Sequence, residues 1–284
     1  MRRLITKFTR SGLATAGLAI VVVVVLAALF GPWITPFDPD IQDITQRLLP
    51  PLSRTDEGLH VLGTDALGRD VLSRLILGSR VSLLVGVAAV LISGVIGVLF
   101  GLLAGYDDRR IGRVLMGITD IQLAIPFLVL ALAVVAVLGP SLFNLIMVLG
   151  VTSWVQYARI VRAEVLVLKD REFVQAARAL GASTLRILGR HLLPNVISSV
   201  VVISSLQVAK MILFESSLSF LGLGVPPSIP TWGGMISDGR DYVSYAWWVA
   251  AVPGLAIFIT VVGINLVGDR LRDLLDPRLK QVEN

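Results

Sequence analysis

Six long apolar runs dominate this sequence and restrict what it can fold into. Each is close to the length of about 20 residues that a helix needs to cross the hydrocarbon core of a bilayer. The mean hydropathy is +0.82 and only 16% of residues are charged, which argues against a soluble enzyme. We therefore predict an all-α polytopic membrane protein with six transmembrane helices, at residues 13–34, 81–105, 114–138, 142–158, 196–221 and 246–267.

The lysines and arginines are divided unevenly between the two sides of the membrane. Outside the spans, alternate segments hold 18 basic residues against 6, with Lys210 left inside the fifth span. Basic residues concentrate in cytoplasmic loops, so the tails 1–12 and 268–284 are predicted to be cytoplasmic and segment 35–80 extracytoplasmic. The five-helix core is then 81–267. The net charge of +5 is explained by these loops without a nucleic-acid partner.

The sequence lacks the residues that most catalytic and metal sites require. It has no cysteine and only two histidines, so thiolate chemistry and a dedicated zinc site are not expected. None of the four lysines follows a glycine, which excludes a phosphate-binding P-loop. We expect no catalytic residue, no metal and no cofactor in this chain.

The loop 159–195, between the fourth and fifth spans, is too long and too ordered in composition to be a simple connector. Apolar residues fall at helical spacing near its middle, and Gly181 can end this helix in a left-handed conformation. A second helix is predicted at 184–191, capped by Ser183, before Pro194 starts the fifth span. The pattern indicates a rigid helical hairpin that can transmit force from a cytoplasmic partner.

This loop resembles the EAA loop of bacterial ABC-importer permeases, whose pattern is E-A-A-x-x-x-G followed, after nine residues, by I-x-L-P. Gln175 stands at the glutamate position and His191 at the isoleucine position. Segments 63–83, 157–162 and 215–233 are also similar to those of C-type permease subunits of dipeptide and oligopeptide ABC importers. Relatives of that group carry nickel chelates or other small solutes.

The resemblance implies a type I ABC importer permease fold in a bacterial inner membrane. It implies that the EAA loop couples this chain to the ATPase, so that transport is driven by ATP hydrolysed on another subunit. The ATPase-coupling residues that it implies are Phe173, Gln175, Ala176, Ala177, Leu180, Gly181, Leu193 and Pro194. The partners it implies are a homologous B-type permease, two ABC ATPase subunits, an extracytoplasmic solute-binding protein and a peptide substrate.

A mostly polar face on the fifth span must avoid lipid. It comprises Ser204, Gln207, Met211 and Glu215, which are spaced to share one side of a helix. Two interpretations stay open: these residues line the translocation path, or they bond to neighbouring helices. Lys210 lies on another side of the same helix and requires a partner, for which a carboxylate on another helix is one candidate.

Three further features carry predictions about packing. Ser93, Gly97, Gly101 and Gly105 form a stripe on which another helix can pack closely, preferably one from the same chain. Pro126 is expected to kink the third span. In the outer segment, a short surface helix is expected at 70–77, and His60 is expected to be an ordinary loop residue.

Two other classes of protein are compatible with six spans. A self-sufficient secondary transporter would need intramembrane carboxylates or an inverted repeat, and only Asp120 and Glu215, both near span ends, fall inside the predicted helices. A membrane scaffold could bind a soluble partner through 159–195 without transporting anything.

Overall fold

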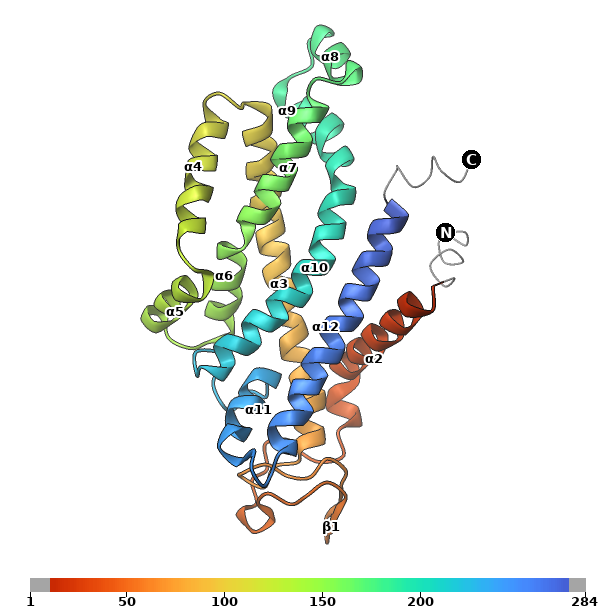
Figure 1. Cartoon of the computed structure of the whole chain (residues 1–284), viewed down its shortest axis with the longest axis vertical. Coiled ribbons are helices and arrows are strands. Elements are labelled where there is room, and N and C mark those ends of the chain that lie inside the picture. The colour runs from red at the N-terminus through yellow and green to blue at the C-terminus, as the bar shows by residue number, and fades with distance from the viewer. Residues whose placement is uncertain (1–10, 276–284) are drawn as a thin grey trace.

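The computed structural model describes residues 11–275, which are mostly helical. They form a long bundle with a short helical hairpin at one end and with two short strands and a short helix at the other (Figure 1). The predicted tails 1–12 and 268–284 lie partly outside the described residues. The elements are α2 (Gly12–Ile34), a 3₁₀ turn (Ile44–Gln46), β1 (Ser53–Thr55), β2 (Gly58–His60), α3 (Val71–Tyr106), α4 (Ile111–Ala124), α5 (Phe127–Leu138), α6 (Leu142–Thr152), α7 (Trp154–Leu168), α8 (Glu172–Ala179), α9 (Thr184–Arg186), a π-helical turn (Ile187–Leu192), α10 (Leu193–Phe220), α11 (Trp232–Gly239), a 3₁₀ turn (Arg240–Tyr242) and α12 (Trp248–Leu275).

Four helices in the described chain are long and apolar enough to cross a membrane: α2, α3, the continuous helix Thr184–Phe220 and α12. The predicted third span is broken into α4 and α5, which meet at 86°. Pro126 lies at this break, where it can donate no backbone hydrogen bond. The predicted fourth span is divided between α6 and α7 at Ser153. The prediction of six spans is therefore only partly confirmed: the described residues give four, or five if α4 and α5 form one.

The second span starts earlier than the sequence indicated. α3 begins at Val71, inside the segment 35–80 that was assigned to the extracytoplasmic side. Asp70 caps it, because its carboxylate accepts a hydrogen bond of 2.7 Å from the backbone N–H of Ser73. The short surface helix predicted at 70–77 is thus corrected: these residues form the first turns of α3. Their polar side chains, buried against the outer segment, hid this continuity in the sequence.

The small-residue stripe on α3 packs against α7 of the same chain, which confirms the preferred interpretation. A Cβ atom on Gly101 would lie 2.7 Å from the Cβ of Val161, and one on Gly105 would lie 2.6 Å from the Cβ of Val165. Only glycine therefore allows this separation between the two helices. α3 and α7 form the tightly packed centre of the bundle.

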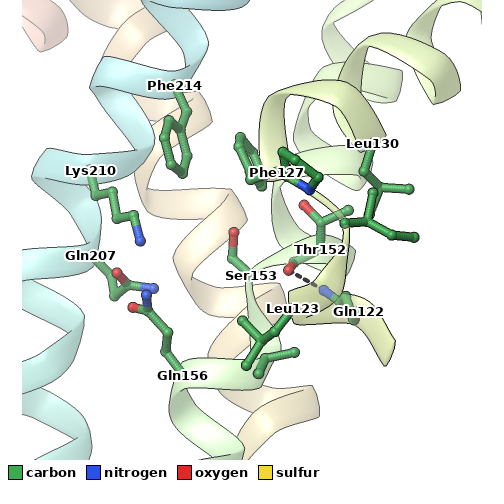
Figure 2. A pocket seen from close by; sticks show the side chains of 13 residues that line it. Gln122, Leu123, Phe127, Leu130, Thr152, Ser153, Gln156, Gln207, Lys210 and Phe214 are labelled. Carbon is green, nitrogen blue, oxygen red and sulfur yellow. Dashed lines mark hydrogen bonds between the residues drawn. The ribbon is translucent and has the colours of Figure 1, made fainter. Parts of the chain in front are cut away.

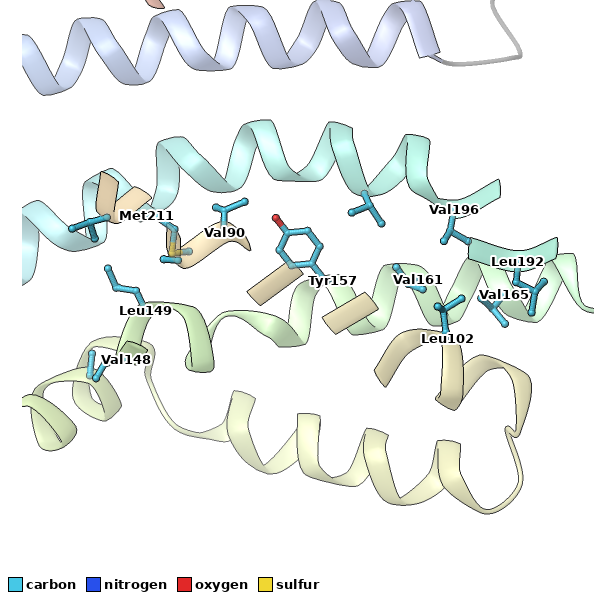
Figure 3. Packing of buried hydrophobic residues seen from close by; sticks show 14 of the residues in the cluster. Val90, Leu102, Val148, Leu149, Tyr157, Val161, Val165, Leu192, Val196 and Met211 are labelled. Carbon is cyan, nitrogen blue, oxygen red and sulfur yellow. The ribbon is translucent and has the colours of Figure 1, made fainter. Parts of the chain in front are cut away.

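Tyr157 lies at the centre of the main apolar core, among side chains from α3, α6, α7 and α10 (Figure 3). Its ring is fully buried. Its hydroxyl donates a hydrogen bond of 3.0 Å to Ser204 Oγ on α10. A buried phenol needs such a partner, so this contact fixes how α7 and α10 face each other.

The end of the bundle that carries β1, β2 and α11 is held together by largely buried polar contacts. His60 Nδ1 lies 2.9 Å from Asp70 Oδ1, and its Nε2 lies 3.1 Å from Gln46 Oε1. His60 is therefore a buried structural residue, and the prediction that it is an ordinary loop residue was wrong. Arg69 Nη2 donates to Asp238 Oδ2 of α11 at 3.2 Å. Burial raises the pKa of Asp238, and Arg69 acts against this rise.

Candidate functional site

The first candidate site is the α8 hairpin, residues 169–192, which stands at the opposite end of the bundle from α11 (Figure 1). α8 carries Glu172 in its first turn and Arg178 in its last, each placed favourably for the helix dipole. The second predicted helix, 184–191, exists but does not end before the fifth span. It runs through the π-helical turn into α10 as one helix. Ser183 stands at its N-cap without a side-chain cap bond.

Pro194 lies at the start of α10 instead of restarting a separate helix. Proline lacks a backbone N–H and crowds the preceding turn of an α-helix. The wider π-helical turn immediately before it accommodates this ring without ending the helix. The hairpin is thereby continuous with the long apolar helix that ends at Phe220.

The turn of the hairpin is a Schellman motif. The N–H of Gly181 donates to the carbonyl of Arg178, and the N–H of Ala182 donates to the carbonyl of Ala177, both at 3.0 Å. Gly181 has a φ of +78°, a conformation that side chains disfavour. The spacing of alanine and glycine that was noted in the sequence is thus the spacing of this motif.

The tip of the hairpin exposes large apolar side chains. Leu180 is 89% exposed, Leu185 is 81% exposed and Phe173 is 42% exposed. On the opposite side, Val174 and Ile187 are buried in the main core. The hairpin therefore has one face fixed to the bundle and one apolar face without a partner in the described chain.

The remaining predicted residues of this site lie on α8, next to the turn, and at the start of α10. Gln175 and Ala176 are exposed, and the side-chain N–H of Gln175 donates to the carbonyl of Lys169 at 3.2 Å. Leu193 is partly buried and Pro194 is exposed at the base of the hairpin. Of the eight predicted residues, six thus lie on α8 and at its turn, and two lie at the start of α10.

Contacts that the sequence analysis missed hold the hairpin to α3. Lys169 Nζ donates to the carbonyl of Gly105 at 3.1 Å. The guanidinium of Arg178 lies over the ring of Tyr106, 5.4 Å from its centroid. Both contacts join residues that are far apart in the sequence, so neither could be predicted from the local spacing of residue types.

An ion pair at the same end joins α7 to the loop after α3. Arg162 Nη2 donates to Asp108 Oδ1 at 2.6 Å. This hydrogen bond lowers the pKa of Asp108, because it stabilises the ionised carboxylate. The pair is partly exposed, so its contribution to stability is small.

The predicted polar face of α10 is mostly engaged within the chain. Ser204 accepts from Tyr157, and Met211 is buried, with its sulfur 3.6 Å from Ser153 Oγ. Glu215 is fully buried and accepts hydrogen bonds from the hydroxyls of Ser82, Ser216 and Ser219. Of the four residues, Gln207 alone lines the cavity described next.

This cavity, the second candidate site, has a volume of about 190 Å³ and lies beside α10 at the break between α4 and α5 (Figure 2). Phe127 and Phe214 form one wall, stacked with their ring centroids 4.0 Å apart. Gln122 lies on the α4 side, where its side-chain N–H donates to the carbonyl of Thr152. The sequence analysis missed this cavity, because it depends on the bend at Pro126. Its lining residues are Gln122, Leu123, Ile125, Pro126, Phe127, Leu130, Thr152, Ser153, Val155, Gln156, Gln207, Lys210 and Phe214.

Two family models match the chain. Residues 97–281 match the binding-protein-dependent transport system inner membrane component, and residues 1–51 match the N-terminal transmembrane domain of oligopeptide transport permease C. The first match covers the α8 hairpin and the cavity. The second covers α2.

Curated relatives align with nearly the whole chain. The di/tripeptide transport system permease protein DppC of Pseudomonas aeruginosa (strain UCBPP-PA14) is 46% identical over 269 residues, 94% of this chain and 88% of the relative. The dipeptide transport system permease protein DppC of Escherichia coli (strain K12) is 44% identical, over 96% of this chain and 92% of the relative. The oligopeptide transport system permease protein OppC of Bacillus subtilis (strain 168) is 40% identical, over 97% and 88%.

A solved structure has the same fold. A chain of the inward-facing MetNI methionine ABC transporter aligns with a TM-score of 0.58 at 21% identity, covering 72% of this chain and 96% of that one. The likeness extends to the type I ABC importer permease fold that the sequence predicted. From these family, sequence and fold matches together, the chain belongs to the family of inner membrane components of binding-protein-dependent transport systems.

Proposed function

We propose that this chain is the permease subunit of an ATP-driven importer of dipeptides or oligopeptides, and that it forms half of the translocation pathway. Its relatives of 40–46% identity named above are all peptide transport permeases, and they align with nearly its whole length. Those relatives are transport permeases, and we place ATP hydrolysis on partner subunits. A homologous B-type permease, two ABC ATPases and an extracytoplasmic solute-binding protein complete the proposed assembly.

The exposed apolar tip of the α8 hairpin is the observation that carries the coupling role. Leu180 and Leu185, next to Phe173, present an apolar patch at the end of a hairpin with a fixed base. Exposed patches of this kind mark protein interfaces. We assign this surface to the ATPase. Gln175, Ala176, Ala177 and Gly181 shape it, and Leu193 with Pro194 connects it to α10.

The proposed mechanism follows from the stiffness of this connection. When the ATPases close on nucleotide, the hairpin moves with them, because its exposed apolar tip is bound to the ATPase. Its opposite face, which includes Val174, is buried in the main core and carries the movement into the bundle. α10 continues directly from the hairpin, and α7, which precedes the hairpin, is packed on α3. The three helices α3, α7 and α10 therefore turn together. Nucleotide binding would in this way shift the population from inward-open to outward-open states.

The orientation is part of the same proposal. The α8 hairpin and the C-terminal end of α12 point toward the same end of the bundle, and the β1–β2 hairpin and α11 lie at the other (Figure 1). Together with the distribution of basic residues, this supports a bacterial inner-membrane protein with both termini cytoplasmic. The outer end, built from segment 35–70 and α11, would then face the solute-binding protein.

Co-purification of the assembled importer tests the coupling role. Leu180→Glu introduces a charge at the most exposed apolar tip residue, and Val243→Glu makes the same kind of change at a residue 52% exposed at the outer end. We expect Leu180→Glu to release the ATPase while the permease stays folded, and Val243→Glu to retain it. Full retention of the ATPase by Leu180→Glu would contradict the assignment.

Uptake into proteoliposomes tests transport and separates it from the other two classes. We expect ATP-dependent peptide uptake that requires the ATPase and the solute-binding protein. Uptake by this chain alone, driven by a proton gradient, would identify a secondary transporter instead. Binding of the ATPase without any uptake would identify a scaffold. Uptake of nickel chelates in place of peptides would change the transported solute, and the chain would still be an ABC importer permease.

A further inference from the structure

Lys210 is a charged side chain near the middle of α10 without a carboxylate partner among residues 11–275. Its ammonium group lies 5.3 Å from the centroid of the Phe214 ring, a contact that supplies only part of what a charge loses on leaving water. The carboxylate that the sequence analysis considered for it on another helix is absent from the described part of the chain. Glu215, on the same helix, is occupied by three serine hydroxyls.

A second polar group at the same cavity is also unpartnered. Gln207 is only 4% exposed, and its side-chain nitrogen has no hydrogen-bond partner in the part of the chain that the structure describes. Figure 2 shows the side chains of Lys210, Gln207 and Gln156 directed toward the same space. A lysine can only donate hydrogen bonds, and the buried amide nitrogen of Gln207 also donates. What is missing from this position is therefore an acceptor, preferably an anionic one.

The other walls of the cavity define what kind of anion fits. Phe127 and Phe214 provide a stacked aromatic surface beside the polar groups, and Gln156 adds an amide that can both donate and accept. This combination suits a ligand that has a charge, amide groups and an apolar side chain close together. The volume of about 190 Å³ is below the ~300–1,000 Å³ of a complete small-molecule site, so this cavity has room for only part of a peptide.

We propose that Lys210, Gln207 and Gln156 form a subsite for the terminal carboxylate of the transported peptide. This inference rests on the proposed function. The single ammonium group, on a flexible stem, is a point charge without the fixed fork of an arginine, and it can hold a carboxylate and then release it. Release is essential, because a site that binds too tightly blocks a pathway. The lysine also gains the counter-charge that residues 11–275 do not supply.

The test compares free-acid and amidated peptides in the assembled importer. Uptake of alanine dipeptide and tripeptide, each as the free acid and as the C-terminal amide, is measured in proteoliposomes with the solute-binding protein present. The variants are Lys210→Met, which has a similar apolar length, and Lys210→Arg, which keeps the charge. Each variant is compared with the wild type on the same peptide, so any preference of the solute-binding protein cancels.

We expect Lys210→Met to lower kcat/KM for the free acids about tenfold, the value of one weak charged hydrogen bond. Uptake of the amides should stay unchanged, and Lys210→Arg should retain most uptake of the acids. Equal losses for acids and amides would overturn the proposal in favour of a fixed ion pair with a partner subunit. Unchanged acid uptake would also overturn it. Failure of the wild type to take up any peptide would contradict the proposed function instead of the subsite.

Discussion

Replacing Gly181 by alanine isolates the contribution of one backbone conformation to the α8 hairpin. A Cβ atom at this position would meet nothing within 4 Å, so the substitution causes no steric clash. The φ of +78° is the only obstacle. A left-handed conformation costs a residue with a side chain about 1–2 kcal/mol. Escape from this strain would break the two 3.0 Å bonds to Arg178 and Ala177, worth about 0.5–1.5 kcal/mol each.

The strain and the lost bonds are similar in size, so we expect Gly181→Ala to weaken the turn by about 1–2 kcal/mol. In native-state hydrogen exchange, this predicts protection of the Ala182 amide that is about 5–30-fold lower. The assay is run on the full chain in nanodiscs. Gly181→Asn should lose less protection, because asparagine tolerates the left-handed conformation better than alanine.

Gly189→Ala is the matched control. Gly189 lies in the π-helical turn of the same hairpin, where a Cβ atom would also meet nothing within 4 Å, and it has no positive φ. Alanine favours helical backbone over glycine, so protection there should stay the same or rise. Unchanged protection in Gly181→Ala, or an equal loss in Gly189→Ala, would refute the argument from backbone conformation.

Two further predictions concern the bundle. Gly101→Ala should lower stability in thermal unfolding by about 1–3 kcal/mol, because its Cβ would clash with Val161. The control Gly94→Ala, on the same helix but with ordinary contacts at 3.8 Å, should leave the stability unchanged. Equal losses of stability in the two variants would contradict close packing as the cause. Asp108, whose pKa is lowered mainly by the hydrogen bond from Arg162, stabilises the fold above its unfolded pKa, and this contribution is lost as the pH falls through the lowered folded value. Asp108→Asn should therefore lose stability at neutral pH and flatten the acid limb of the unfolding profile, whereas an unchanged limb would show that the ion pair contributes nothing.

The sequence determined the features that depend on local composition and spacing. Apolar length located the helices α2, α3, α10 and α12, because crossing a bilayer requires a minimum run of apolar residues. The order of Ala177 and Gly181 located the turn of the hairpin, because a Schellman motif is formed within a few residues of chain. The small-residue stripe correctly indicated close packing, and the structure supplied its partner, α7.

Only the tertiary structure decided the features that depend on contacts between distant segments. Pro126 was identified as a kink, but the 86° angle between α4 and α5 depends on what each helix packs against. The burial of His60 depends on Asp70 and Gln46, which fold back onto it from either side in the sequence. The roles of the polar residues on α10 were likewise not local. One helical face holds both Glu215, bound by serines, and Gln207, whose side-chain nitrogen faces a cavity and has no partner among the described residues. Helical periodicity fixes which side of a helix a residue occupies, whereas the neighbour it meets there is set by the packing of the whole bundle.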